Sequence, residues 1–315
     1  MKILVQMDDI FKINVKTDST YRIMLFGQEL GYEIYYYTPD QLSFDSNSQD
    51  LRAFISKVKL TNDPVNYCQI IEQKYDSLKN YQVILVRQDP PFDMNYITST
   101  YLLEKISDKV LVLNDPLQIR NSPEKIFVTE FANLTPPTLI SSDKIALKQF
   151  QQLHKKIIVK PLYSCGGEGV VYLEEDSVNF NSIIELLISK YQAPIVAQQF
   201  IADVKFGDKR IILIDGEYAG GIVRMPQNNE IRSNLHIGGV AQVLKASSRD
   251  LEICQSLKDS LQKRNLFFVG IDIIGDYLTE INVTSPTCIP EINQLANCSI
   301  EKIFFDKLAL KIKNR

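Results

Sequence analysis

Short hydrophobic runs alternate with longer amphipathic segments in the first third of the chain. In the segment 18–30 apolar residues recur at helical spacing, Asp18 or Ser19 can cap the first turn, and Gly31 can end the helix. Runs rich in Val, Ile, Leu and Tyr predict strands at residues 2–7, 33–37, 83–87 and 110–114. Helix-length segments separate these strands, so the pattern predicts a parallel, doubly wound α/β domain.

The pattern changes after Asn121, where predicted strands follow one another with few helices between them. Asp215-Gly216 and Gly275-Asp276 are strong signals of hairpin turns. The hydrophobic runs that predict strands lie at residues 157–160, 170–173, 195–198, 209–214, 218–225, 267–274 and 277–283. This part of the chain is therefore expected to be α+β.

Composition and charge narrow the class of protein. Of the 315 residues, 45% are hydrophobic and 23% are charged, which is typical of a folded globular chain. The net charge of −3 gives no basic field, so we expect no nucleic-acid partner. The five cysteines form no CxxC pair and His154 and His236 are the only histidines, so a zinc site has few ligands. No run approaches the roughly 20 apolar residues of a membrane helix, and we expect a cytoplasmic protein with reduced thiols and no membrane association.

A glycine-rich loop lies between two predicted strands, at residues 160–169 with the sequence KPLYSCGGEG. Gly166 and Gly167 would let backbone N–H groups approach a phosphate closely, and Lys160 would add a positive charge. The GxxxxGK spacing of a P-loop and the GxGxxG spacing of a dinucleotide fold are both absent. A tight hairpin that needs glycine for its left-handed backbone explains the loop equally well.

A second group of polar residues lies within the predicted hairpin at residues 272–282. Glu280 and Asn282 are two apart on a strand and share a face, and oxygen ligands on a rigid strand suit Mg²⁺. A three-residue loop at 275–277, or an equivalent bulge, would pair Asp272 with Glu280 and keep the apolar residues on the buried side. The alternative is the exposed polar face of a half-buried hairpin.

Positive charges accompany these two features. Each lysine or arginine taken singly is typical of a solvated surface, but together they suit a polyphosphate and the transition state of phosphoryl transfer. The cations of this region are Lys125, Lys160, Lys209, Arg210, Arg224 and Arg232.

Runs across nearly the whole chain resemble the bacterial glutathione synthetases of the ATP-grasp superfamily. The most specific of them is VTSPTC at residues 283–288, because other superfamily members such as D-alanine ligases lack it. The similar runs are residues 86–93, 124–127, 158–161, 207–211, 270–276 and 279–288. The resemblance implies an ATP-grasp fold with an N-terminal parallel-sheet (pre-ATP-grasp) domain at 1–121, a central subdomain with the glycine-rich loop at 122–200, and a C-terminal subdomain with the metal-binding hairpin at 201–315.

The resemblance also implies a role for each matching residue. ATP would be bound by Lys125, Lys160, Gly166, Gly167, Gln198, Gln199, Phe200, Ile201 and Asp208. Mg²⁺, or Mn²⁺ in its place, would be held by Asp272, Glu280 and Asn282, and the phosphoryl group by the catalytic residues Arg210, Arg224 and Arg232. Arg87, Asp89, Ser285 and Thr287 would contact the acyl donor.

The reaction implied by the resemblance joins γ-glutamylcysteine to glycine through an acyl phosphate, and gives glutathione, ADP and phosphate. The resemblance also implies that the protein forms a homo-oligomer, and more specifically a tetramer. Another ATP-grasp carboxylate–amine ligase, a nucleotide-binding regulatory protein and an NAD-linked oxidoreductase are the competing classes, and the missing GxGxxG disfavours the last. The chain departs from the family pattern at Ser164-Cys165, Val240 and Pro290.

The segment 227–240 combines turn-forming residues with little apolar surface, and Arg232 is its only lysine or arginine. We expect it to be a mobile lid that brings Arg232 to the reacting centre, with a passive surface loop as the alternative.

Overall fold

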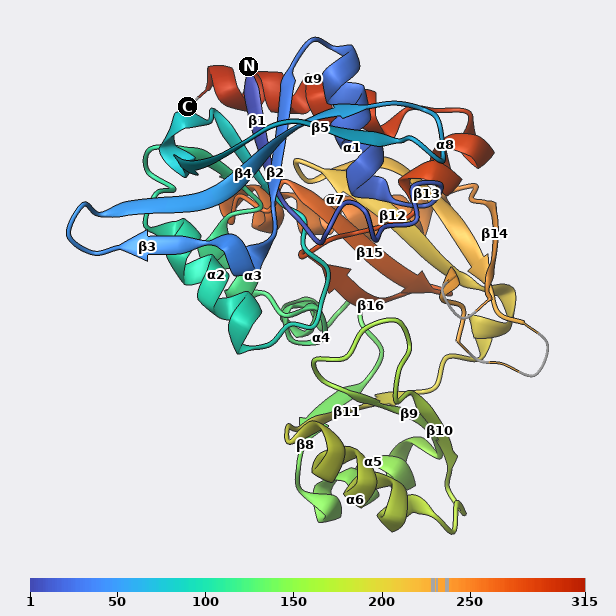
Figure 1. Cartoon of the computed structure of the whole chain (residues 1–315). Coiled ribbons are helices and arrows are strands. Elements are labelled where there is room, and N and C mark those ends of the chain that lie inside the picture. The colour runs from blue at the N-terminus through green and yellow to red at the C-terminus, as the bar shows by residue number, and fades with distance from the viewer. Residues whose placement is uncertain (228–229, 231, 236–237, 315) are drawn as a thin grey trace.

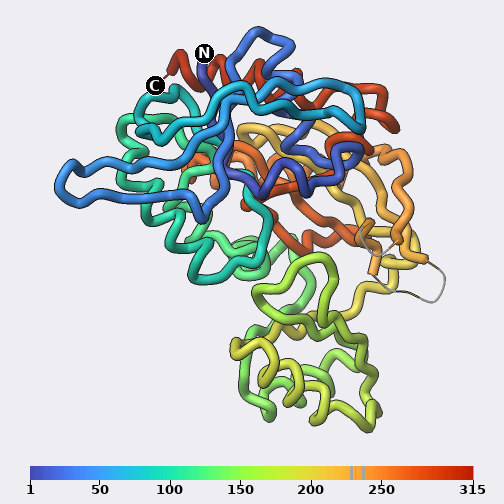
Figure 2. The backbone as a smooth tube through the Cα atoms, in the orientation of Figure 1, coloured from blue at the N-terminus to red at the C-terminus, as the bar shows by residue number. Residues whose placement is uncertain are grey.

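The computed structural model describes residues 1–227, 230, 232–235 and 238–314. The strands in these residues form three sheets that follow one another along the chain (Figure 1). Figure 2 shows the chain descending from a large body into a small unit, which holds the second sheet, and returning to the body. The helices are α1 (Ser19–Glu29), α2 (Met94–Glu104), α3 (Pro116–Asn121), α4 (Glu124–Phe127), α5 (Lys144–His154), α6 (Phe180–Tyr191), α7 (Ser248–Lys263), α8 (Ile289–Ala296) and α9 (Ile300–Lys313). None of these described helices has the length and apolar character needed to cross a membrane.

The first sheet has a parallel centre. β1 pairs in parallel with β2 and β6, and β6 pairs in parallel with β7, as the hydrophobic pattern predicted. The strands of this sheet are β1 (Lys2–Gln6), β2 (Glu33–Tyr37), β3 (Ser43–Asp45), β4 (Asp50–Leu60), β5 (Cys68–Ser77), β6 (Val83–Val86) and β7 (Leu111–Leu113).

The segment between β2 and β6 differs from the prediction. A helix-length segment was expected there, but the chain forms the antiparallel hairpin of β4 and β5, and β4 also pairs antiparallel to β2. Leu51, Ala53 and Ile55 are buried on alternate positions of β4, which is the period of a strand. β5 is largely exposed, so its hydrophobic pattern was too weak to predict it.

Helices cover both faces of the parallel strands, as a doubly wound domain requires. Ile3 and Val5 of β1 share a core with α1, whereas Leu4 shares a core with α2. α1 begins where predicted, because the Asp18 carboxylate accepts a hydrogen bond from the backbone N–H of Tyr21 at 2.6 Å.

The second sheet is antiparallel and forms the small unit with α5 and α6. Its strand order is β10-β9-β11-β8, and Ile157 and Val159 of β9 pack under the two helices. The opposite face of β9 carries Ile158 and Lys160. The strands are β8 (Thr138–Ser141), β9 (Lys156–Pro161), β10 (Val171–Glu174) and β11 (Ile195–Gln199). Of these four strands, β8 was not predicted.

The third sheet is antiparallel, with the order β14-β13-β12-β15-β16. α7 covers the face that carries Ile211 and Ile271, and α8 and α9 pack against the other face, next to Ile212 and Phe268. The strands are β12 (Asp208–Ile214), β13 (Glu217–Met225), β14 (Val240–Val243), β15 (Phe268–Ile274) and β16 (Tyr277–Asn282), of which β14 was not predicted.

The hairpin of β15 and β16 has the predicted register, which pairs Asp272 with Glu280. A bulge produces this register, and not the longer loop. Its turn contains two residues, because Ile274 pairs with Tyr277, so the three-residue loop was wrong. A register shift leaves Thr279 without an opposite residue, and this bulge pairs Asp272 with Glu280. Gly275 in this turn has the left-handed backbone, with φ of 56°.

Candidate active site

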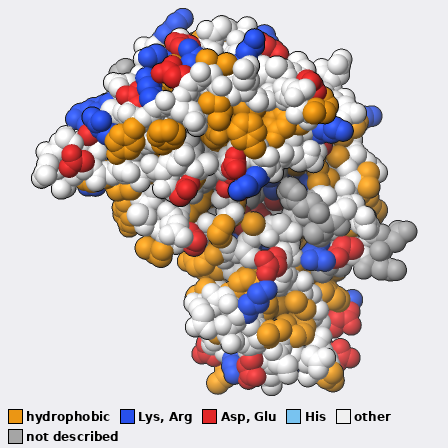
Figure 3. Space-filling model, in the orientation of Figure 1, with side chains coloured by type: hydrophobic (Ala, Val, Ile, Leu, Met, Phe, Trp, Pro, Cys, Tyr) orange, Lys and Arg blue, Asp and Glu red, His pale blue; other side chains and the backbone are white. Residues whose placement is uncertain are grey.

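A cavity opens between the second and third sheets and holds about 980 Å³ of empty space, including its opening to solvent. Charged side chains gather on the surface where the small unit meets the large body (Figure 3). All of the residues predicted to be catalytic, ATP-binding or metal-binding line this one cavity. They are Lys125, Lys160, Gly166, Gly167, Gln198, Gln199, Phe200, Ile201, Asp208, Arg210, Arg224, Arg232, Asp272, Glu280 and Asn282.

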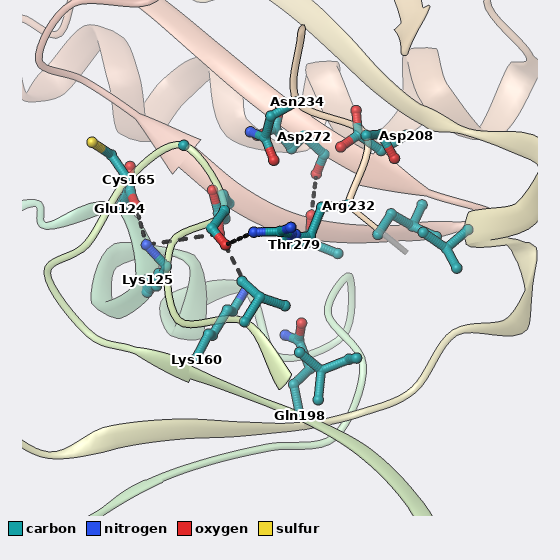
Figure 4. Close-up of a pocket in the computed structure, with 18 of the residues that line it drawn as sticks. Glu124, Lys125, Lys160, Cys165, Gln198, Asp208, Arg232, Asn234, Asp272 and Thr279 are labelled. Atoms are coloured by element: carbon teal, nitrogen blue, oxygen red, sulfur yellow. Dashed lines mark hydrogen bonds and ion pairs between the residues drawn. The ribbon is translucent and has the colours of Figure 1, made fainter. Parts of the chain in front are cut away.

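Two lysines converge on Glu280 from different elements. Lys160 Nζ of β9 lies 3.1 Å from Glu280 Oε1, and Lys125 Nζ of α4 lies 3.8 Å from the same oxygen (Figure 4). The lysine side chains are only 9% and 5% exposed, so neither is the solvated cation that a lysine usually is. Burial alone would raise the pKa of Glu280, but the two ammonium groups outweigh it and lower that pKa. The carboxylate is therefore held ionised.

Two arginines converge on Asp272 in the same way. Arg210 Nη2 lies 2.9 Å from Asp272 Oδ2, and Arg224 Nη2 lies 3.0 Å from Oδ1. Burial opposes ionisation, but the two guanidinium groups outweigh it and lower the pKa of Asp272. Arg224 also bonds Asp208 Oδ1 at 2.6 Å, and burial raises the pKa of Asp208 despite this contact. These ion pairs lie on one face of the third sheet.

The glycine-rich loop closes one side of the cavity at residues 162–170. It connects the antiparallel neighbours β9 and β10, but its nine residues do not form the tight hairpin of the alternative interpretation. Gly166, Gly167 and Gly169 have the left-handed backbone, and the loop lines the cavity. Gly167 has φ of 80°, and a Cβ there would lie 2.8 Å from Asn234 Oδ1 and 3.2 Å from Arg232 Cδ. Lys125 Nζ donates to the Ser164 carbonyl at 2.6 Å. The loop is thus tied to the lysines on one side and meets Arg232 on the other.

Arg232 lies at the edge of the cavity. Its Nη2 is 2.6 Å from Glu230 Oε2, and its Nη1 donates to the Gly167 carbonyl at 3.4 Å. The predicted lid also includes residues 228, 229, 231, 236 and 237, which lie outside the described residues, as does the candidate ligand His236. The lid therefore stays a prediction.

The cavity also has an apolar part, of which sequence reasoning found Phe200 and Ile201 but missed the other aliphatic residues. The backbone at 198–201 borders it, and Phe200 packs against Tyr172 with ring centroids 4.7 Å apart. Ile158, Val170, Val204 and Ile274 supply apolar lining, and Glu124 and Cys165 stand beside the lysines. No signal in the sequence separates these aliphatic residues from ordinary core residues. Such a surface suits a planar, apolar ring.

The residues predicted to bind the acyl donor do not line this cavity. Arg87 lies at the end of β6, is buried, and donates from Nη2 to the Pro286 carbonyl at 2.8 Å. Ser285 and Thr287 flank Pro286 in the chain, and Asp89 is exposed beside Asp8. The structure thus brings Arg87 to the segment that follows the β15–β16 hairpin.

Metal binding depends on the donor chemistry of Asp272, Glu280 and Asn282. Within the described residues no cluster of three or more acidic, histidine or cysteine side chains suits a metal. Asn282 Nδ2 is 3.4 Å from Asp272 Oδ2, and Asp272 pairs with Glu280 across the hairpin. Two carboxylates and one amide in a single cavity fit Mg²⁺, which completes its shell with water and substrate phosphates.

Solved structures of two synthetases share this fold. D-cycloserine synthetase DcsG matches with a TM-score of 0.69 at 12% identity, over 98% of this chain and 99% of its own. D-alanyl-alanine synthetase A from Vibrio cholerae matches with a TM-score of 0.60 at 12% identity, over 100% and 99% of the two chains. A family model of an ATP-grasp domain matches residues 124–297, and with the fold it defines the chain as an ATP-grasp enzyme, of the class of ATP-dependent ligases.

Sequence comparison narrows this class to one family. The models of the prokaryotic glutathione synthetase N-terminal domain and ATP-grasp domain match residues 1–120 and 124–297. Glutathione synthetase of Mesorhizobium japonicum is 44% identical over 99% of both chains, and that of Brucella melitensis is 45% identical over 97% of both. The chain belongs to the prokaryotic glutathione synthetase family.

Proposed function

We propose that this protein joins γ-glutamylcysteine to glycine with conversion of ATP to ADP and phosphate, and so makes glutathione. One observation carries the proposal: a single cavity gathers Lys125, Lys160, Arg210, Arg224 and Arg232 around Asp272 and Glu280. A cavity so rich in cations suits a polyphosphate and a phosphoryl group in transfer. The full-length similarity to glutathione synthetases supplies the identity of the substrates.

The nucleotide would lie along the small unit. The adenine ring would pack against the apolar lining and bond the backbone at 198–201, and Asp208 would meet the ribose. Lys125, Lys160 and the N–H groups of Gly166 and Gly167 would bind the phosphates. When the nucleotide enters, Lys160 would exchange Glu280 for a phosphate oxygen. The ionised Glu280 is then free to bind a cation.

Asp272, Glu280 and Asn282 are the residues that would hold Mg²⁺, or Mn²⁺ in its place. A bound divalent ion would neutralise negative charge on the phosphates. The low pKa of both carboxyl groups favours the ionised form that such a ligand needs.

The chemistry proceeds in two displacements. A carboxylate oxygen of the dipeptide's cysteine attacks the γ-phosphorus, and the bond to ADP breaks. The amine nitrogen of glycine, once deprotonated, attacks the acyl carbon, and phosphate leaves with the electron pair of the acyl–oxygen bond. Arg210 and Arg224 would stabilise the transferred phosphoryl group, and Arg232 the tetrahedral intermediate. Arg87, Asp89, Ser285 and Thr287 would position the donor.

The same family membership supports three further proposals. Residues 1–121, 122–200 and 201–315 act as the N-terminal, central and C-terminal units of the fold. The protein works as a homotetramer, and it resides in the cytoplasm. Sedimentation equilibrium would test the tetramer, because a monomer mass near 36.0 kDa would contradict it.

An ADP-release assay tests the function. With Mg²⁺, ATP, γ-glutamylcysteine and glycine present, we expect ADP and glutathione in equal amounts, and no steady ADP release when either amino-acid substrate is omitted. ADP release at the full rate without glycine would indicate an ATPase. Turnover with another amine in place of glycine, but none with glycine, would indicate a different ATP-grasp ligase.

A further inference from the structure

A cluster of polar residues outside the central cavity lies at the carboxyl ends of β1 and β6. These neighbouring parallel strands are followed by helices on opposite faces of the sheet, α1 after β1 and α2 after β6. In open α/β sheets the crevice beyond such a switch point is the usual place for a ligand. The switch-point cluster consists of Asp8, Asp18, Arg87, Asp89 and Tyr96.

Two buried polar groups of this cluster have no hydrogen-bond partner among the described residues. Arg87 is 6% exposed; its Nε donates to Thr20 Oγ1 at 3.0 Å and its Nη2 to the Pro286 carbonyl at 2.8 Å, but Nη1 is unpaired. Tyr96 is 1% exposed, and its hydroxyl is also unpaired. Buried donors without partners are rare in folded proteins. Both groups can donate to a carboxylate.

The same cluster has an excess of negative charge. Asp18, Asp89 and Tyr96 interact electrostatically with the guanidinium of Arg87, and Asp8 Oδ2 accepts a hydrogen bond from the backbone N–H of Asp89 at 2.7 Å. Burial raises the pKa of both Asp8 and Asp18, and Asp89 adds to the rise as a like charge. A cation bound here would relieve this repulsion. The cluster can therefore bind one anionic group at its unpaired donors and one cationic group at its carboxylates.

The cluster is connected to the reacting centre through Pro286. Its carbonyl holds Arg87, and a Cβ placed on Gly270 would lie 3.0 Å from Pro286 Cβ and 3.5 Å from Arg210 Cδ. Pro286 thus lies between the cluster and the cavity. An extended dipeptide spans about 7 Å, and a γ-glutamyl linkage adds two methylene groups to that length. A donor bound at Arg87 can therefore reach towards Arg210.

We propose that the switch-point cluster binds the zwitterionic α-amino-acid head of the acyl donor. Arg87 Nη1 and the Tyr96 hydroxyl donate to its α-carboxylate, and Asp8 and Asp18 accept from its α-ammonium group. This inference rests on the proposed function and adds the group by which a γ-linked donor is selected. An α-linked glutamyl peptide has no free α-carboxylate on its first residue, so it cannot make the pair with Arg87.

The test removes one hydroxyl. In Tyr96→Phe we expect the KM for γ-glutamylcysteine to rise by about tenfold or more, because a hydrogen bond to a charged group is lost. The KM values for ATP and glycine, and kcat at saturating donor, should stay as in the wild type. Tyr101→Phe is the matched control, since Tyr101 lies on the same helix, is 51% exposed and contacts Arg120 through its ring.

Two donor analogues identify the groups that are bound. Glutarylcysteine lacks the α-ammonium group and 4-aminobutyrylcysteine lacks the α-carboxylate, and we expect each to have at least a tenfold higher KM than the dipeptide. With 4-aminobutyrylcysteine the wild type and Tyr96→Phe should have the same KM. The unfolding midpoint of Tyr96→Phe should not fall, because the hydroxyl has no partner in the part of the chain that the structure describes. A clear fall would overturn the assignment.

The outcomes separate this inference from the function on which it rests. If the wild type turns over the dipeptide while Tyr96→Phe and both analogues leave the KM unchanged, the head-group site is wrong and the function stands. If the wild type releases no ADP with the dipeptide and glycine, the proposed function fails and this inference fails with it.

Discussion

Replacement of Lys160 by alanine removes one of the two cations that hold Glu280. In the structure Lys160 Nζ is 3.1 Å from Glu280 Oε1, and Lys125 Nζ remains 3.8 Å from the same oxygen after the change. If Lys160 leaves Glu280 to bind a phosphate, the variant loses that contact in the nucleotide complex. The substitution should therefore affect both nucleotide affinity and stability.

The size of each effect follows from the contact that is lost. A hydrogen bond to a charged group contributes about 1.5–3 kcal/mol, so the Kd for the nucleotide should rise roughly 10- to 150-fold. Leaving a buried ion without its partner costs about 3–5 kcal/mol. Because Glu280 keeps Lys125, we expect a smaller loss in the free energy of unfolding, about 1–3 kcal/mol.

Calorimetric titration with a non-hydrolysable ATP analogue measures the first effect, and urea unfolding measures the second. Lys156→Ala is the matched control, because Lys156 begins the same strand but is 60% exposed and lies 3.5 Å from Glu174. We expect no measurable change in that variant. An unchanged Kd in folded Lys160→Ala, or an equal rise in Lys156→Ala, would refute a phosphate contact at Lys160.

Four further results are expected. Chelation by EDTA should abolish ADP release, and added Mg²⁺ should restore it; activity that persists without divalent ions would contradict the metal site. Gly167→Ala should lower nucleotide affinity more than Gly166→Ala. Both glycines have a left-handed backbone, but only at Gly167 do other atoms lie within 4 Å of the added Cβ. Arg232→Ala should lower kcat, and the ligands should slow hydrogen exchange at 227–240; unchanged turnover and exchange would refute the lid. Asp272→Asn should reduce the dependence of the unfolding free energy on acid pH. The arginine partners outweigh burial and lower the pKa of Asp272, so its ionised form stabilises the fold above the ordinary Asp pKa of about 4, and this stabilisation is lost as the pH falls further. The variant's unfolding free energy should therefore fall less steeply with acid.

The sequence predicted most strands whose residues are buried, namely the parallel centre and most of the two antiparallel sheets. The β4–β5 hairpin was missed, although Leu51, Ala53 and Ile55 of β4 are buried on a regular period. No residue of its partner β5 is buried, so the hydrophobic pattern did not indicate a second strand. The bulge at Thr279 was expected only as one of two routes, since the apolar face of β16 fits a longer loop as well as a bulge.

The site was predicted unevenly for a similar reason. Charged residues on strands, such as Lys160 and Asp272, are visible in a sequence because they interrupt hydrophobic runs. The apolar lining at Ile158 and Ile274 does not interrupt any run, so it cannot be told from the core. The Tyr96 hydroxyl cannot be recognised from the sequence either, because only a structure shows that it has no partner among the described residues.

The third sheet explains how the ion pairs of the cavity are kept in place. Arg210 and Ile212 are two apart on β12 and share a face; Ile212 is buried beside α8 and α9, whereas Arg210 pairs with Asp272 in the cavity. A slip of one residue would turn Ile212 towards α7, where Ile211 now lies, and would take Arg210 out of the cavity. Both faces of β12 carry buried apolar residues, so apolar burial alone does not distinguish the two registers. We infer that the pairing of Arg210 with Asp272 selects the observed register, although a buried ion pair contributes little net stability.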